Sequence, residues 1–282
     1  MVRVLMDFGI DSVKLTGGEP MLRPDILEIV ERLGKLGLRD LSMTTNGTRL
    51  PRLAEELRRR GLKRVNISLH SVDPRKFCWI TGQADEESGL RRFQYTISAI
   101  KSALEAGLRP VKLNVVIMKG VNDDEIERLI GFVKSLGGGD SLILQLIELV
   151  PEGSASDTRF FEKYFYSLGE VEKDLERRAV KTVVRRLHLR KQYLLPNGVW
   201  VELVRPTNNY VFCMNNNRIR ITYDGKFKPC LMRDDNHVDF LTAMRAGANN
   251  EEIKEIFLEA VRRREPYWKP PNLKPYPDIK WC

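Results

Sequence analysis

Cysteine and long apolar runs are both scarce in this sequence. Four cysteines in 282 residues are too few for the disulfide framework that stabilises small secreted domains. No apolar run approaches the roughly 18 residues that cross a bilayer, and the first seven residues lack the apolar stretch of a signal peptide. These absences argue against a disulfide scaffold and a membrane-spanning protein, so we expect a cytoplasmic chain with reduced cysteines.

Low-complexity segments are absent as well, and the composition is that of a globular protein with 42% hydrophobic and 30% charged residues. Lys and Arg number 47 against 38 Asp and Glu, a net charge of +9. A basic surface favours nucleotides, phosphates or nucleic acid, and an equally weighted alternative is a solvated surface rich in ion pairs. No nucleic-acid motif accompanies the charge, so that partner is not expected.

Polar residues recur at the downstream ends of short apolar segments. The expected strands are 13–16, 41–44, 65–69, 111–115 and 142–148. Helices are expected between them, at 24–36, 51–61, 95–106 and 123–136, the last capped by Asn122. Because side chains alternate along a strand, each polar set falls on one face. Alternating strands and helices predict a parallel α/β sheet, here an incomplete (β/α) barrel with its site at the strand ends.

The pattern changes after Val150. We expect a loop at 151–156, one helix at 159–178, β-type runs at 199–204, 218–223 and 226–231, a last helix at 251–264 and an extended tail at 266–282. Asp224-Gly225 is a hairpin signal between the last two runs. The sequence therefore predicts a barrel domain over 1–155 and a smaller α+β domain over 156–282.

The turn Gly17-Gly18-Glu19-Pro20 follows the first expected strand. Two glycines let a ligand approach the backbone, and a carboxylate on such a turn can hold an ammonium group. The alternative is a plain tight turn with an exposed Glu.

Two lysines lie on expected barrel strands, where Lys14 shares a face with Thr16 and Lys112 shares one with Asn114. Unless such a lysine extends outward to water, it needs an anion in the barrel mouth. Ser68 and His70 also share a face, although a lone histidine is more often structural than a ligand.

Cys213 and Cys230 flank the expected hairpin, and thiolates are the usual ligands of iron sites. Two cysteines do not fill such a site, and buried free cysteines are common. Arg218 and Arg220 alternate, so both point the same way. Paired arginines suit carboxylate, phosphate or the guanine edge, or they form a charged exposed strand face.

Together these motifs resemble one family. The matching segments include Thr16-Gly17-Gly18-Glu19-Pro20, Asn217-Arg218-Ile219-Arg220 after Cys213, and residues 44–47, 65–69, 80–83, 111–114, 120–123 and 147–149. They look like GTP 3′,8-cyclases, radical S-adenosylmethionine lyases that begin molybdenum cofactor synthesis. The resemblance implies two 4Fe–4S clusters. The first cleaves S-adenosylmethionine to a radical that attacks the ribose of GTP, yielding (8S)-3′,8-cyclo-7,8-dihydroguanosine 5′-triphosphate, and the second binds the guanine.

The resemblance also assigns residues to ligands. It implies that Gly18, Ser68 and Val150 contact S-adenosylmethionine. Contacts to GTP are implied for Lys14, Thr44, Lys112, Arg218, Ile219 and Arg220, and second-cluster ligation for Cys213 and Cys230. As further partners we consider the next enzyme of the pterin pathway and a second copy of the chain, and we expect no membrane.

The sequence departs from the family pattern at three places. The CxxxCxxC loop of the first cluster is not in these 282 residues, Asn216 stands where the second cluster has its middle cysteine, and Gln145 stands where bacterial members carry arginine. An amide is a poor iron ligand beside thiolate. We therefore expect this chain as it stands not to cleave S-adenosylmethionine, and the alternative is a non-catalytic GTP-binding member of the family.

Overall fold

The computed structural model describes residues 1–151 and 158–269, in two compact units. The larger comprises Val2–Val184 and Lys191–Arg205, and the smaller comprises Met1, Arg185–Arg190 and the chain from Pro206 onward. The loop expected at 151–156 and the tail expected at 266–282 lie largely outside the described residues, as does Cys282.

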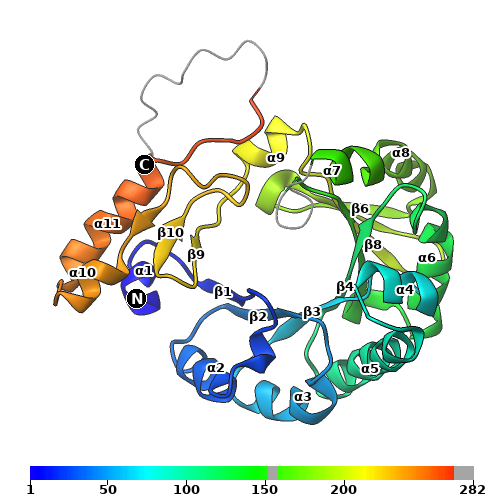
Figure 1. Cartoon of the computed structure of the whole chain (residues 1–282), viewed down its shortest axis with the longest axis horizontal. Coiled ribbons are helices and arrows are strands. Elements are labelled where there is room, and N and C mark those ends of the chain that lie inside the picture. Colours follow the sequence, from blue (N-terminus) through cyan, green and yellow to red (C-terminus); the bar gives the residue numbers. More distant parts are fainter. Residues whose placement is uncertain (152–157, 270–282) are drawn as a thin grey trace. The chain divides into compact units, whose positions relative to one another are not determined.

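The larger unit is built on an eight-stranded sheet with the order β1-β2-β3-β4-β5-β8-β7-β6 (Figure 1). The pairs from β1 to β5 and the β5–β8 pair are parallel, whereas β7 pairs antiparallel with β8 and β6. The strands are β1 Ser12–Leu15, β2 Asp40–Thr45, β3 Arg64–Ser68, β4 Val111–Ile117, β5 Leu142–Glu148, β6 Lys181–Val184, β7 Lys191–Leu194 and β8 Trp200–Val204. The mixed α/β class and the five expected strands are confirmed.

Helices cover the outer side of this curved sheet (Figure 1). They include α2 Ile26–Gly34, α3 Leu50–Arg59, α5 Glu86–Glu105 and α6 Ile126–Ser135. The unit also contains α1 Val2–Met6, α4 Pro74–Ile80, α7 Thr158–Tyr164 and α8 Gly169–Arg178. The strand residues with apolar side chains form one buried core with these helices, among them Met43, Ile67, Leu113, Leu144 and Val201. The alternate strand positions point to the other face, which leaves that face for polar side chains.

Two helix predictions are wrong in extent. The helix expected at 95–106 begins at Glu86, because the Asp85 carboxylate accepts from the Ser88 N–H and starts it early. The helix expected at 159–178 is two helices, α7 and α8. Between them Phe165 forms a β-bridge with Met118, and the Leu168 N–H donates to the Glu148 carboxylate at 3.1 Å. These contacts hold the segment in a non-helical path.

The sheet continues beyond the domain boundary that the sequence predicted near residue 155. Strand β8 pairs in parallel with β5, with Gln145 opposite Glu202, and β7 and β6 extend the sheet from there. The division between the two compact units falls between Arg205 and Pro206. Strands β6 and β7 were not predicted.

The smaller unit contains α9 Tyr210–Met214, β9 Arg220–Ile221, β10 Lys226–Lys228, β11 Val238–Asp239, α10 Leu241–Arg245 and α11 Asn250–Arg262. The predicted hairpin is confirmed, since β9 pairs antiparallel with β10 around Asp224-Gly225. Gly225 has φ +79°, and a Cβ there would lie 2.3 Å from the Leu241 Cβ, so glycine is required twice over. Buried Phe227 contacts the rings of Phe240 and Phe257.

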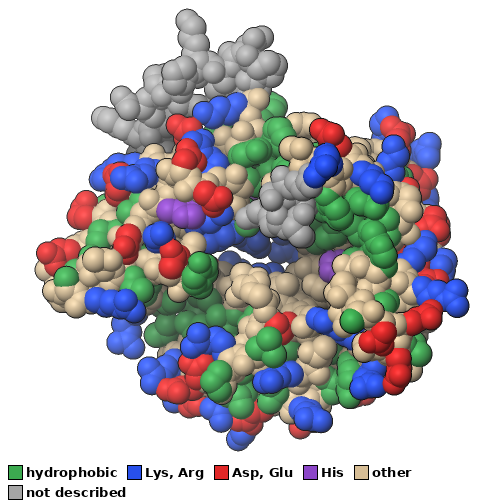
Figure 2. Space-filling model, in the orientation of Figure 1, with side chains coloured by type: hydrophobic (Ala, Val, Ile, Leu, Met, Phe, Trp, Pro, Cys, Tyr) green, Lys and Arg blue, Asp and Glu red, His purple; other side chains and the backbone are tan. Residues whose placement is uncertain are grey.

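The surface of the larger unit carries charges of both signs side by side over its helices (Figure 2). Arg32 pairs with Glu28 and Lys35 with Glu31 along α2, and Arg60 pairs with Glu31 and Glu56 beside α3. Such exposed pairs stabilise by little each. Among the described residues no helix is both long and apolar enough to cross a membrane.

Candidate functional site

A cavity of about 380 Å³ lies at the downstream ends of β1, β2 and β3. Its lining comes from the turn after β1, the end of β2 and the residue after it, the last residue of β3 and one residue of α5: Thr16, Gly17, Gly18, Glu19, Thr44, Thr45, Asn46, Ser68 and Arg92. Ends of parallel strands meet at one edge of a sheet, which is why these separate segments converge. The structure therefore brings together Gly18, Thr44 and Ser68, three of the residues singled out in the sequence.

The Gly17-Gly18 turn presents bare backbone to this cavity. Gly17 has φ +143°, and a Cβ on either glycine would meet nothing within 4 Å, so the space beside the backbone is open to a ligand. The Glu19 carboxylate accepts from the Met21 N–H at 3.1 Å, the Thr45 hydroxyl at 2.8 Å and the Asn46 N–H at 2.7 Å. It thereby ties the first strand-end turn to the second.

A row of polar side chains crosses the inner face of the sheet. The strand register aligns Ser68, Asn114, Gln145, Glu202 and Gln192 on five neighbouring strands. Residues opposite each other in a ladder share a face. The polar face predicted from the alternation along each strand is confirmed, and it extends further across the sheet than predicted.

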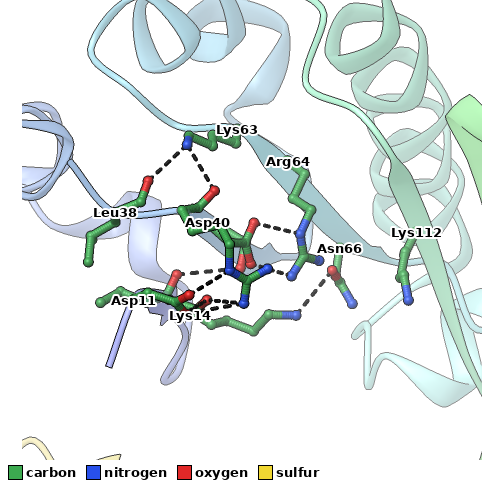
Figure 3. Close-up of polar contacts among 12 residues, drawn as sticks. Asp11, Lys14, Leu38, Asp40, Lys63, Arg64, Asn66 and Lys112 are labelled. Atoms are coloured by element: carbon green, nitrogen blue, oxygen red, sulfur yellow. Dashed lines mark hydrogen bonds and ion pairs between the residues drawn. The ribbon is translucent and has the colours of Figure 1, made fainter. Parts of the chain in front are cut away.

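Lys14 belongs to this face. Its ammonium group donates to the side-chain oxygen of Asn66 at 3.2 Å (Figure 3). The Asn66 side-chain amide donates in turn to the Asn114 side-chain oxygen at 3.2 Å. Lys14 on β1 thus spans β2 to reach β3. The residue of β2 that is paired with Lys14 is Ser42, whose small side chain leaves room for the lysine stem.

Lys112 lies deeper, with a side chain only 5% exposed. It forms an ion pair with Glu202 on β8, whose side chain is fully buried, and the Gln192 amide also donates to that carboxylate. A buried charge needs a partner of opposite sign. Sequence reasoning missed Glu202, although a single carboxylate in the apolar run 199–204 was the signal that could have found it.

His70 ends the β3–β4 ladder with an unusual backbone. Its φ is +61°, and its Nδ1 accepts from the Val116 N–H at 3.3 Å. An acceptor nitrogen requires the neutral ring, and burial lowers the pKa of His70 to about 4. The structural role that the sequence favoured for His70 agrees with this contact.

The sequence predicted that Asn122 caps the following helix, but its side chain makes no capping hydrogen bond. The Asn122 side chain instead bonds to the loops after β3 and β4. It is fully buried. Its amide donates to the carbonyls of His70 at 2.7 Å and Val116 at 2.8 Å, and its oxygen accepts from the Met118 N–H at 2.7 Å. The two loops that follow β3 and β4 are therefore locked together.

The other predicted binding residues lie elsewhere. Val150 follows the end of β5. Arg218, Ile219 and Arg220 belong to the smaller unit, where the Arg218 carbonyl accepts from the Arg264 guanidinium at 3.2 Å. Burial lowers the pKa of Arg264. The convergence of Arg218 with Lys14 and Lys112 stays a prediction.

Cys213 and Cys230 are both partly buried in the smaller unit. Burial raises the pKa of the Cys213 thiol, and the nearby Cys230 adds to this shift. Asn216 does not replace the missing thiolate, because its side-chain oxygen accepts from the Arg218 N–H at 3.0 Å. Within 1–151 and 158–269, no three His, Cys, Asp or Glu are grouped to hold a metal. The described residues therefore do not fit a cluster held by three thiolates.

Cys78 is a structural residue of the larger unit. Its thiol donates to the Asp85 carbonyl at 3.3 Å. A Cβ on Gly89 would lie 2.4 Å from this sulfur, so α4 and α5 pack closely at this point.

Comparison with known proteins agrees with the fold and the strand-end turn. Residues 1–133 match the radical SAM superfamily and residues 142–270 match Molybdenum Cofactor Synthesis C. These matches define a radical S-adenosylmethionine protein with the C-terminal region of molybdenum cofactor synthesis.

Similar proteins from archaea identify the family within this class. Three proteins, each named "Probable GTP 3′,8-cyclase", are 50% identical in Thermococcus kodakarensis, 47% in Pyrococcus horikoshii and 42% in Archaeoglobus fulgidus. The alignments cover 95% of this chain and 83–84% of each relative. The chain belongs to the GTP 3′,8-cyclase family.

Proposed function

We propose that this chain binds S-adenosylmethionine and GTP as a member of the GTP 3′,8-cyclase family. In this proposal the curved sheet is the incomplete barrel of radical S-adenosylmethionine proteins. The observation that carries the proposal is the strand-end cavity, because open glycine backbone, four strand-end hydroxyls and a guanidinium line one space. Cavities with few convergent polar groups at strand ends are the usual ligand sites of such folds.

The roles follow the chemistry of the lining. Gly18 and Ser68 offer backbone and a hydroxyl to S-adenosylmethionine, with Val150 as an apolar contact. Lys14 and Lys112 supply ammonium groups and Thr44 a hydroxyl for GTP. A phosphate at Lys112 must compete with Glu202 for the ammonium group, since the two side chains are already paired. The hairpin residues Arg218, Ile219 and Arg220 complete the proposed GTP contacts.

The proposal makes one statement about iron, which concerns the second cluster site. A 4Fe–4S cluster, where bound, supplies the electron that cleaves S-adenosylmethionine in this family. The engagement of Asn216 with the Arg218 N–H supports a second site short of one thiolate. We therefore propose that the second site does not hold a complete 4Fe–4S cluster, and that these residues bind S-adenosylmethionine and GTP. The non-catalytic GTP-binding member drawn from the sequence is the alternative.

The test is calorimetric titration of the anaerobically purified chain with S-adenosylmethionine. Ser68→Ala should lower its affinity about tenfold, as expected for one lost hydrogen bond in a site. Ser135→Ala, an exposed hydroxyl bonded to its own helix, is the matched control and should leave the affinity unchanged. Absent binding, or equal affinities in both variants, would contradict the assignment of the cavity.

The iron content of the purified chain tests the statement about the second cluster site. After anaerobic purification we expect fewer than eight irons per chain, because the second site is short of one thiolate. Eight irons per chain would contradict the incomplete second site, and formation of 5′-deoxyadenosine from S-adenosylmethionine and dithionite would rule out the non-catalytic alternative.

A further inference from the structure

Arg92 is the cavity residue that neither the sequence motifs nor the family resemblance singled out. It lies on α5, within a run of charged residues typical of a solvated helix face, yet it lines the same cavity as Gly18 and Ser68. Its neighbour Arg91 is 63% exposed and pairs with Glu87 along the helix. The two adjacent arginines therefore have different surroundings.

Arg92 is held at the cavity by close packing of α5 on the turn after β2. Gly47 in that turn has φ +85°, and a Cβ there would lie 2.9 Å from the Cβ of Ala99 on α5. The Thr96 hydroxyl also lies against the turn, 3.4 Å from the Asn46 carbonyl. One helical turn before Thr96, Arg92 is thereby directed toward the strand ends.

In the described part of the chain, the Arg92 guanidinium makes no ion pair or side-chain hydrogen bond. The carboxylate in the same cavity, Glu19, is engaged by three protein donors. A guanidinium stays charged at every physiological pH, and leaving it partly buried without a counter-ion is unfavourable. An anionic group of a ligand in the cavity would supply this counter-ion.

We infer that Arg92 binds an oxyanion of the ligand in this cavity, the carboxylate of an amino-acid end. This inference rests on the proposed function, in which S-adenosylmethionine occupies the cavity. A carboxylate has about four acceptor positions, so Glu19 retains one for an ammonium group. The cavity thus offers a carboxylate and a guanidinium to a zwitterion, and the planar guanidinium binds a carboxylate with two parallel hydrogen bonds. A GTP phosphate shares this oxyanion chemistry.

The experiment compares Arg92→Gln, Arg92→Lys and the control Arg91→Gln by calorimetry. The ligands are S-adenosylmethionine, its decarboxylated analogue, GTP and guanosine. For S-adenosylmethionine we expect about a tenfold or greater loss of affinity in Arg92→Gln. Arg92→Lys should lose less, because lysine keeps the charge without the paired geometry. The decarboxylated analogue should bind all three variants equally.

The results distinguish a carboxylate from a phosphate as the partner of Arg92. They also distinguish failure of this inference from failure of the proposed function. Loss of GTP but not guanosine affinity in Arg92→Gln would assign the oxyanion to phosphate. Equal affinities of Arg92→Gln and Arg91→Gln for all ligands that bind the unmodified chain would overturn the inference alone. Failure of the unmodified chain to bind either S-adenosylmethionine or GTP would overturn the proposed function and the inference with it. Urea unfolding midpoints of the variants verify that each is folded.

Discussion

Lys112 and Glu202 form a buried ion pair on the inner face of the sheet. Both side chains are almost fully withdrawn from water, and Gln192 donates to the same carboxylate. Such a pair adds little net stability compared with apolar residues, but breaking it leaves a buried charge. The pair therefore fixes the position of Lys112, the proposed GTP contact, on its strand.

Removing the carboxylate tests this view. Glu202→Gln keeps the shape but removes the buried carboxylate that pairs with Lys112, and we expect the free energy of unfolding to fall by about 3–5 kcal/mol. Glu28→Gln, which breaks the exposed pair with Arg32, should change it by less than about 1 kcal/mol. Urea unfolding of both variants measures the difference. Equal unfolding midpoints would show that the buried pair is not needed.

His70 predicts a pH dependence of stability. Its folded pKa of about 4 lies below the ordinary 6.5, because burial and the Val116 N–H favour the neutral ring. Between these values the unfolded chain binds the proton and the folded chain does not, so stability falls as the pH drops from about 6.5 to 4 and levels below that. The shift corresponds to about 3 kcal/mol.

Replacing His70 measures its contribution to the pH dependence of stability. Asn tolerates the left-handed backbone of position 70 and does not titrate, so His70→Asn should flatten the loss of stability between pH 6.5 and 4. His188, whose pKa burial also lowers to about 4, remains in both proteins. Urea unfolding across this pH range provides the measurement. Parallel pH profiles for the two proteins would contradict the account of His70.

At the scale of elements, the contact between α5 and the turn after β2 shapes the cavity. Gly47→Ala combines a left-handed backbone with a Cβ 2.9 Å from Ala99, so α5 must move. We expect a loss of about 1–3 kcal/mol in unfolding free energy and weaker S-adenosylmethionine binding as Arg92 shifts.

Gly37→Ala is the matched control for this contact. Gly37 has φ +72°, but a Cβ there would meet nothing within 4 Å. It should lose only about 1 kcal/mol from backbone strain and keep its ligand affinity. Identical behaviour of the two variants in unfolding and calorimetry would remove the role assigned to the packing of α5.

The elements differ in how well the sequence predicts them. Strands β1 to β5 follow from apolar alternation with polar ends, because one face packs on helices and the other does not. Strand β6 was missed, since it is an edge strand with exposed Val184 and no burial pattern. The break between α7 and α8 depends on the distant residues Met118 and Glu148, which a local pattern does not contain.

The same limit applies to the site. Gly18, Thr44 and Ser68 follow strands directly, so local pattern and the family motif both pointed to them. Arg92 lies inside a charged helix segment, and only the docking of α5 directs it to the cavity. Glu202 is 90 residues from Lys112 in the chain, and register across the sheet, rather than spacing, brings them together.

At the scale of the whole molecule, the account assigns nucleotide binding to both units. The proposed contacts of the larger unit are those of the strand-end cavity with Lys14 and Lys112, and the proposed contacts of the smaller unit are Arg218 and Arg220 of the hairpin. Paired arginines discriminate guanine by its acceptor edge, so the proposal makes the base, and not only the phosphates, a determinant of affinity.

Calorimetric titration of the purified 282-residue chain with GTP and with ATP is the most direct test of this claim. The account predicts saturable GTP binding and at least about tenfold weaker ATP binding, a difference of about 1.4 kcal/mol. Equal affinity for the two nucleotides, or no binding of GTP, would contradict it.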